Sequence, residues 1–123
     1  MVNVKEANGL ILAYWGDAVW ELLVREHGIA KGYNISNLNR YCKKFVHAKI
    51  QSMMLQKILP LLEKEDAEIV KRAKNSNIKT FPKSCSVMEY KEATAFEALI
   101  ALWYQRGEVE RIREIIKNME EII

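Results

Sequence analysis

The chain is organised around one largely apolar stretch, LILAYWGDAVWE (residues 10–21), and a second, EATAFEALIALWY (residues 92–104), near its other end. Each stretch carries one acid inside its apolar part, Asp17 in the first and Glu97 in the second. An unpaired carboxylate among buried groups is costly, so it normally takes a cation or becomes neutral. We therefore expect the two acids to share one explanation.

The first stretch predicts a helix from Asn8 to His27, with Asn8 as its N-cap and Gly28 as its C-terminal stop. Helical spacing predicts that six apolar side chains face the core: Leu12, Trp15, Ala18, Val19, Leu22 and Leu23.

Around Asp17 the pattern predicts a close helix crossing. Tyr14, Asp17 and Glu21 share a second face of the helix. Gly16 costs about 1 kcal/mol relative to alanine inside a helix, and close approach of another backbone would compensate for it. Small residues also flank Glu97, namely Ala93, Thr94, Ala98 and Ala101. Such a crossing would allow both carboxylates to bind one ion.

The remaining segments predict an all-α fold of about six helices, since none shows sustained strand alternation. Further helices are expected from a cap at Ser36 or Asn37 to Val46, then at Ala48–Leu59, Glu63–Asn75, Met88–Arg106 and Glu108–Ile122. Residues 75–87 form the one long irregular segment, which is rich in turn formers.

Length and composition predict one domain spanning residues 1–123, in a reducing, cytoplasmic compartment. The net charge of +3 permits a polyanionic partner. Cys42 and Cys85 belong to no paired motif and are expected to be thiols, with a disulfide left open. No apolar run reaches the roughly 20 residues of a membrane span, and His27 and His47 are interpreted as structural or surface residues.

Two carboxylates without a neighbouring histidine or cysteine favour Mg²⁺ or Mn²⁺ over zinc. Such an ion suits phosphodiester hydrolysis, because it activates water and stabilises developing charge. The alternative for each acid is that Asp17 and Glu97 face solvent or pair with Arg or Lys. Glu21 could be a third, outer-shell group or could face solvent.

A basic segment from residue 71 to 88 carries no acid, and a surface of one sign is what phosphate contacts need. Its cations are Lys71, Arg72, Lys74, Lys79 and Lys83. The alternative, weighed equally, is a helix C-terminus with dipole-complementing lysines followed by a solvated loop.

Two motifs carry a resemblance to a known family. YWGDAV (residues 14–19) resembles the signature of ribonuclease III catalytic domains, and TAFEALIA (residues 94–101) resembles their second acidic motif. With RAKN (residues 72–75) and Pro82-Lys83, the chain is similar to mini-ribonuclease III, the branch that lacks a double-stranded-RNA-binding domain. Ala13 and Thr94 stand where full-length ribonuclease III carries further acids, so the number of metal ions stays open.

The resemblance implies a ribonuclease III-type domain of about six or seven helices and a homodimeric, Mg²⁺-dependent endonuclease that cuts both strands of duplex RNA. Members of this branch mature large-subunit (23S) ribosomal RNA ends in bacteria. Asp17 and Glu97 would hold the metal, Tyr14 would pack into the partner subunit, and residues 72–83, including Asn75, would help to grip RNA. Whether a ribosomal protein presents the substrate stays open.

Two other functions were weighed. A non-catalytic RNA-binding or ribosome-associated relative of the same fold would be marked by loss of an acid, yet both acids are present. A helical protein-interaction domain without a nucleic-acid role would leave the embedded acids and the one-signed loop without an explanation.

Overall fold

Six segments of helical periodicity form six α-helices, and the residues that the computed structural model describes (3–4, 6–78 and 80–123) include no β-strand. The elements are α1 (Gly9–Ala30), α2 (Ile35–Phe45), α3 (Ala48–Ile58), the 3-10 turn η1 (Leu59–Leu61), α4 (Lys64–Lys74), α5 (Val87–Gln105) and α6 (Val109–Glu120). The all-α prediction is confirmed.

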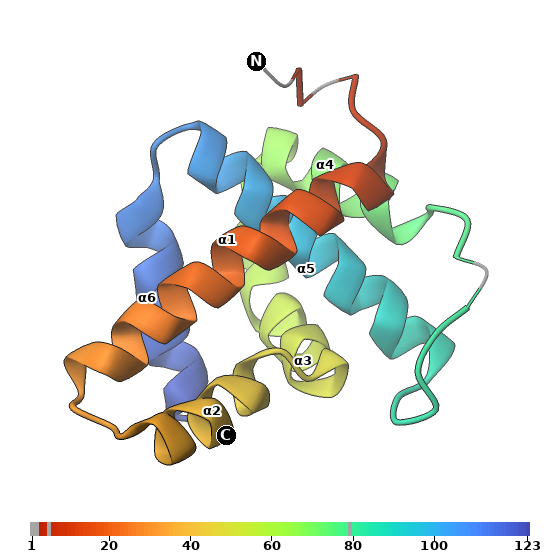
Figure 1. Cartoon of the computed structure of the whole chain (residues 1–123). Helices are drawn as coiled ribbons and strands as arrows, with labels where there is room; N and C mark the ends of the chain where they lie inside the picture. The colour runs from red at the N-terminus through yellow and green to blue at the C-terminus, as the bar shows by residue number, and fades with distance from the viewer. Residues whose placement is uncertain (1–2, 5, 79) are drawn as a thin grey trace.

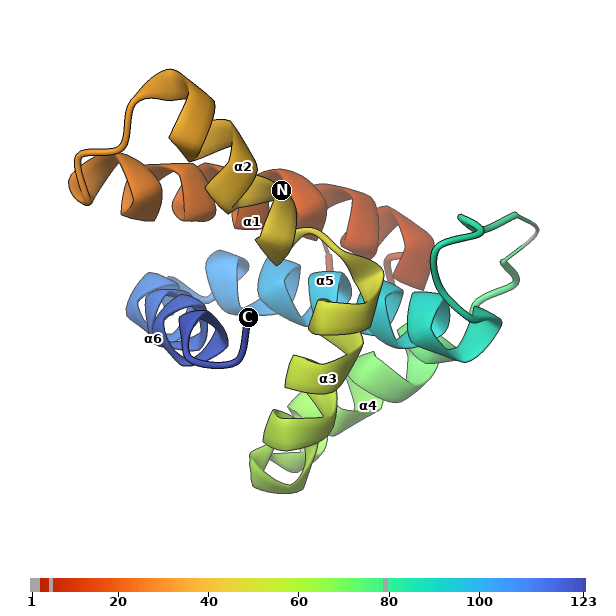
Figure 2. The same ribbon diagram turned by 90° about the horizontal axis from the view of Figure 1, so that it is seen from below.

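Helix α5 lies at the centre of the molecule (Figures 1 and 2). Helix α1 packs along one side of it, α3 and α4 pack on the other side, and α6 crosses near its C-terminal end. A helix that is covered on several sides must be apolar nearly all round, which is why residues 93–103 of α5 show little amphipathic alternation. Only Glu97 interrupts the buried run in that segment.

The core of the α1–α5 layer is aromatic. Trp20 is fully buried, packs edge-to-face on Phe96 with ring centroids 4.9 Å apart, and donates its indole N–H to the Phe45 carbonyl at 2.8 Å. A buried tryptophan needs such an acceptor for its N–H. These contacts hold the start of the α2–α3 connection against the α1–α5 pair.

Local capping signals set several helix ends. Asn8 caps α1, as predicted, by accepting a hydrogen bond from Leu10 N at 2.7 Å. Ser86 and Glu89 form a reciprocal capping box at the start of α5. Helix α2 begins slightly earlier than predicted, because the capping side chain is Asn34 rather than Ser36 or Asn37.

The predicted end of α1 at Gly28 is wrong, since the helix continues to Ala30. Gly28 is buried against α2, and a Cβ there would lie 2.6 Å from Leu38 Cδ1 and 3.0 Å from Tyr41 Cδ2. Its glycine therefore serves helix packing. The chain turns instead at Gly32, whose φ of +82° lies in the left-handed region that glycine adopts readily.

The core face of α1 was predicted only in part. Leu12, Val19 and Leu23 are buried, but Leu22 is 54% exposed and Ala18 is also exposed. The buried face is centred on Gly16 and Trp20, so positions 18 and 22 lie on the opposite side of the helix. That side is free to meet something other than this chain's own core.

Cys42 and Cys85 are both free thiols, which confirms the prediction for them. Within the described residues, no helix has the length and apolar character that crossing a membrane requires.

Candidate active site

The site forms where α1 and α5 touch backbone to backbone. A Cβ on Gly16 would lie 1.7 Å from the Glu97 carbonyl oxygen and 2.6 Å from its carbonyl carbon. No real side chain tolerates such distances, so the two helices can cross this closely only because residue 16 is glycine. The close backbone approach predicted for Gly16 is therefore confirmed, and the backbone that approaches is that of Glu97.

This crossing brings the two predicted site acids together. Asp17 follows Gly16 directly, and its carboxyl is hydrogen-bonded to that of Glu97; both side chains are half-buried. Burial raises the pKa of Glu97 to about 9, and the hydrogen bond to Asp17 and the charges of Asp17 and Glu21 act in the same direction. The raised pKa of Glu97 therefore favours its protonated form at neutral pH.

Neither acid is compensated by the protein itself. Among residues 3–4, 6–78 and 80–123, no Lys, Arg or His forms an ion pair with Asp17 or Glu97. The alternative that these acids simply pair with a neighbouring cation is thus removed. Two carboxylates that must share one proton form a site that a divalent cation would stabilise, because it would neutralise both at once.

The donor set fits a hard cation with few protein ligands. It consists of carboxylate oxygens, which suit Mg²⁺ or Mn²⁺. The described part of the chain has no group of three or more His, Cys, Asp or Glu residues placed to hold a metal ion, so water would complete the coordination. Glu21 contributes charge near Glu97, and its role as an outer-shell group remains a prediction.

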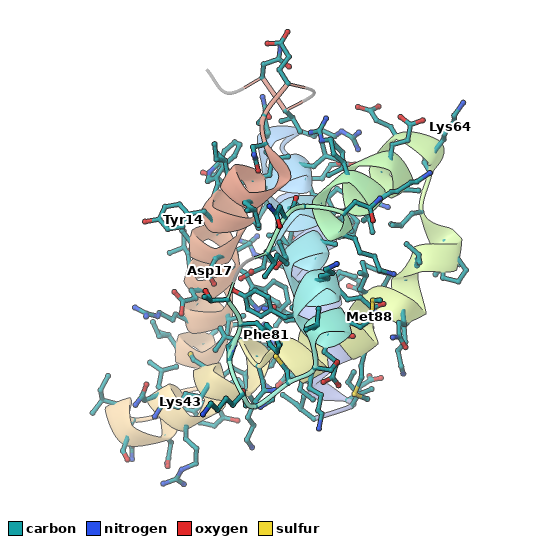
Figure 3. All side chains as sticks on the ribbon, turned by 90° about the vertical axis from the view of Figure 1, so that its right-hand side faces the viewer. Tyr14, Asp17, Lys43, Lys64, Phe81 and Met88 are labelled. Atoms are coloured by element: carbon teal, nitrogen blue, oxygen red, sulfur yellow. The ribbon has the colours of Figure 1, made fainter. Side chains whose placement is uncertain are left out.

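A pocket of about 300 Å³ opens beside Glu97. Its walls come from the α2–α3 connection, the loop before α5 and the first turns of α5. Lys43 and His47 line it and bring positive or titratable groups to the acid pair. Asp17, Phe81 and Lys43 lie on the same side of the molecule in Figure 3.

Lys43 and His47 belong to the site although neither was predicted from sequence as a site residue. His47 was interpreted as structural, and it does cap α3 by accepting a hydrogen bond from Lys49 N at 3.3 Å, yet it also lines the pocket. A signal was available, since the chain has no Asp or Glu between Glu26 and Glu63. That interval is longer than the acid-free segment from residue 71 to 88.

Four of the predicted RNA-binding residues leave that prediction open. Lys71, Asn75 and Lys83 have exposed side chains near or on the segment that joins α4 to α5. Asn75 also ends α4 as its C-cap. Lys79 lies outside the described residues.

The other two have partners within the protein. Arg72 donates a hydrogen bond from Nη2 to the Val4 carbonyl at 2.7 Å. Lys74 Nζ lies 3.9 Å from the carboxylate of the buried Glu92, which also accepts a hydrogen bond from Ser52 at 2.9 Å. These contacts give Arg72 and Lys74 structural roles that the charge pattern did not reveal.

Tyr14 points away from the body of the protein and is 84% exposed (Figure 3). It belongs to a stripe of exposed apolar side chains on the outer face of α1, which we call the α1 stripe: Ile11, Tyr14, Ala18, Leu22 and Ile29. The stripe contains the two residues that were wrongly placed in the core. A contiguous apolar stripe of this kind on the exposed face of a helix is typical of an interaction surface.

Comparison with known proteins gives a consistent result. Residues 10–108 match the model of the Ribonuclease III domain. The chain is 57% identical over 120 residues to a Mini-ribonuclease 3-like protein from Ilyobacter polytropus, covering 96% of this chain and 94% of the relative. It is 39% identical over 117 residues to a Mini-ribonuclease 3 from Brevibacillus brevis, covering 94% and 87%.

A crystal structure of a protein from Fusobacterium nucleatum has a similar fold. It aligns with a TM-score of 0.88 at 48% sequence identity and covers 98% of each chain. Fold, motif order and sequence identity over nearly the full length agree with one another. The chain therefore belongs to the ribonuclease III family of endoribonucleases and, within it, to the mini-ribonuclease III branch.

Proposed function

We propose that this protein is a divalent-metal-dependent endoribonuclease that cuts double-stranded RNA at a site made by Asp17 and Glu97. The observation that carries the proposal is the acid pair itself: two half-buried carboxylates interact at a helix crossing, and within the part of the chain that the structure describes no Lys, Arg or His forms an ion pair with them. Such an arrangement is costly for stability, and it is typical of a site that waits for a positive ligand.

Asp17 and Glu97 would hold Mg²⁺, or Mn²⁺ in its place. The bound ion supplies Lewis-acid stabilisation of the charge that develops on the phosphate and lowers the pKa of the attacking water. The chain's own contribution is geometric and electrostatic. Gly16 allows α1 and α5 to approach backbone to backbone beside the two carboxylates, and Glu97, whose pKa is raised, would have to lose its proton to hold a cation.

Two one-signed segments support RNA binding. Lys43 and His47 line the pocket beside Glu97, which supports a role for them in contacting phosphates near the scissile bond. The last turn of α4 supplies the exposed Lys71, and the α4–α5 loop supplies the exposed Lys83. A-form RNA is recognised largely by shape, phosphates and 2′-hydroxyls, so a basic surface around the acid pair suits a duplex without reading its sequence. Affinity should then fall steeply with salt.

The α1 stripe supports a homodimer. A two-fold axis beside α1 would pack the stripe of one copy on the stripe of the other, with Tyr14 at its centre. Asp17 lies on the same helix, three residues from Tyr14, so the interface would hold two acid pairs at a fixed separation. Two sites related by two-fold symmetry suit cleavage of both strands of a duplex.

For the natural substrate we infer precursor large-subunit ribosomal RNA in the cytoplasm. The support is the resemblance to the mini-ribonuclease III branch together with the identities to its members.

The test is cleavage of a structured ribosomal RNA precursor in Mg²⁺ by the wild type and by Asp17→Asn. Glu26→Gln, which removes an exposed acid from the same helix, is the matched control. We expect cutting by the wild type and the control, and loss of cutting with retained RNA binding in Asp17→Asn. Equal cutting by all three proteins would overturn the assignment of Asp17, and RNA binding without cutting by any of them would favour the non-catalytic alternative.

A further inference from the structure

The start of α1 and the end of α4 form one junction (Figure 1). Gly9 is buried there, and a Cβ on it would lie 2.7 Å from both Ala73 Cα and Ser76 Oγ. Ser76 stands just after α4, where the basic loop begins. The first turn of the helix that carries Asp17 therefore rests directly on the base of that loop.

Arg72 closes this junction from the other side. Its Nη2 donates to the Val4 carbonyl at 2.7 Å, and Val4 is only 8% exposed and belongs to the hydrophobic core. The chain then turns back through a hydrogen bond from Ala7 N to the Asn3 carbonyl at 2.9 Å and enters α1 at the Asn8 cap. Arg72 thus fastens the segment before α1 to the last turn of α4.

The opposite end of the loop is held as well. Ser86 N donates to Glu89 Oε1 at 2.8 Å and Glu89 N donates to Ser86 Oγ at 3.0 Å, which fixes the start of α5. Contacts within the protein therefore fix both ends of the loop, at Ser76 and at Ser86. A change at either anchor would move the whole loop relative to the acid pair.

We propose that Arg72 is a positioning residue: by fastening the N-terminal segment to α4, it sets where the α4–α5 loop stands relative to Asp17 and so assists RNA binding without touching a phosphate. This rests on the proposed function, in which the loop contacts RNA, and it replaces the prediction that Arg72 binds RNA directly. The bond from Arg72 Nη2 to the main-chain carbonyl of the buried Val4 holds the guanidinium at the junction between the N-terminal segment and α4.

The test compares the salt dependence of RNA binding and the cleavage kinetics of wild type, Arg72→Gln and Lys71→Gln. Lys71→Gln is the matched control, because it removes the same charge from the adjacent, exposed residue. For Arg72→Gln we expect a KM raised about tenfold, an unchanged kcat and an unchanged salt slope. A log–log salt slope that falls by about 0.9, as for one lost phosphate contact, would overturn the proposal.

Deletion of residues 1–7 tests the same link without altering the charge of α4 and leaves the Asn8 cap in place. We expect it to raise KM as much as Arg72→Gln does, and the combined variant to be no worse than either alone. Additive effects would contradict the proposal. If neither the wild type nor any variant binds RNA, the proposed function fails, and Tm then tests the link between Arg72 and residues 1–7. Equal, non-additive decreases in Tm for Arg72→Gln and the deletion support the link, and additive decreases overturn it.

Discussion

Two buried acid clusters in this protein have opposite electrostatics. Asp66 on α4 is 1% exposed, and it accepts hydrogen bonds from Trp103 Nε1 at 3.0 Å, Arg106 Nη1 at 2.7 Å and Arg111 Nη1 at 3.2 Å. The Asp17–Glu97 pair is less buried, yet each carboxyl has mainly the other for company. The Asp66 carboxylate has hydrogen-bond and ion-pair partners within the protein. Among the described residues, Asp17 and Glu97 have no cationic partner.

The pKa values follow from this difference. Burial opposes ionisation of Asp66, but the hydrogen bonds from Trp103 and Arg106 and the nearby arginine charges outweigh it and lower the pKa of Asp66. Burial also opposes ionisation of Glu97, and there the neighbouring acid reinforces it, so the pKa rises to about 9. The comparison teaches that buried acids are not equal: the compensated one ties α4, α5 and α6 together, whereas the uncompensated pair marks a site that needs a ligand.

The largest expected effect concerns catalysis. Asp17→Asn and Glu97→Gln should each slow single-turnover cleavage of duplex RNA by at least about a thousandfold, roughly 4 kcal/mol, because each removes one oxygen ligand from the proposed metal site. The double variant should be no slower than either single variant, since the two acids act as a unit. As a control, Asp66→Asn should keep the wild-type cleavage rate per folded molecule. If the rate losses of Asp17→Asn and Glu97→Gln multiply in the double variant, the two acids do not act as a unit and the contrast with Asp66 is wrong.

Next in size is the effect of Gly16→Ala on folding. The new methyl would need the space of the Glu97 carbonyl, so α1 and α5 must separate, and we expect a loss of about 4 kcal/mol in the free energy of unfolding. Urea unfolding followed by circular dichroism measures this. Gly28→Ala is the matched control, because its methyl meets side-chain atoms of Leu38 and Tyr41 and should cost only about 1 kcal/mol. Equal costs would mean that the crossing is not specially tight.

Asp66→Asn should lower the free energy of unfolding by about 3 kcal/mol at neutral pH, since it leaves Arg106 and Arg111 without their buried counter-charge. The pKa of Asp66 is lowered on folding, so its contribution is present above the ordinary value of 3.8 and is lost as the pH falls through the lowered pKa. Wild type and variant should therefore converge in acid. Unfolding curves at several pH values measure this, and a constant gap down to about pH 2 would contradict it.

The smallest expected effect has the opposite sign. Without divalent ions, Glu97→Gln should stabilise the protein by about 1 kcal/mol, because it removes a carboxyl that the fold holds in an unfavourable place. The pKa of Glu97 is raised from 4.5 to about 9 on folding, so its penalty is absent below about pH 4.5 and grows as the pH rises towards 9. The advantage of the variant should grow over the same interval.

Thermal melts in a chelator measure that gain, with Glu26→Gln as a control that should show none. Adding Mg²⁺ or Mn²⁺ should then raise the Tm of the wild type and leave Glu97→Gln unchanged, because ligands stabilise only the state that binds them. A wild type that gains nothing from either ion would argue against a metal at this pair.

Much of the fold could be predicted, because its signals are local. Helical periodicity located all six helices, and Asn8 was identified as a cap from its own residue type. Gly28 was misassigned because a glycine that ends a helix and a glycine that admits another helix look alike in sequence. Leu22 was placed in the core because an apolar residue meant for a partner has the same chemistry as one meant for the interior.

The site was predicted where chemistry and spacing agreed, and it was incomplete where they did not. Asp17 and Glu97 are conspicuous because an acid inside an apolar helix is unusual. Lys43 and His47 are unremarkable residues in sequence, and only packing brings them to the pocket beside Glu97. The same packing gives Arg72 the carbonyl of the core residue Val4 as a hydrogen-bond partner.

Residue types and their spacing were sufficient to predict that this chain is all-α, that two acids lie in its most apolar helices and that glycine precedes the first of them. These are properties of residue type and period, which act over a few residues. Packing across helices brings Asp17 and Glu97, which lie 80 residues apart in sequence, into contact, and it gives Asp66 two arginine partners. Among the described residues, the same packing gives Asp17 and Glu97 no arginine partner. The reason is that compensation of a buried charge depends on which side chains meet across helices, and that is set by packing of the whole core.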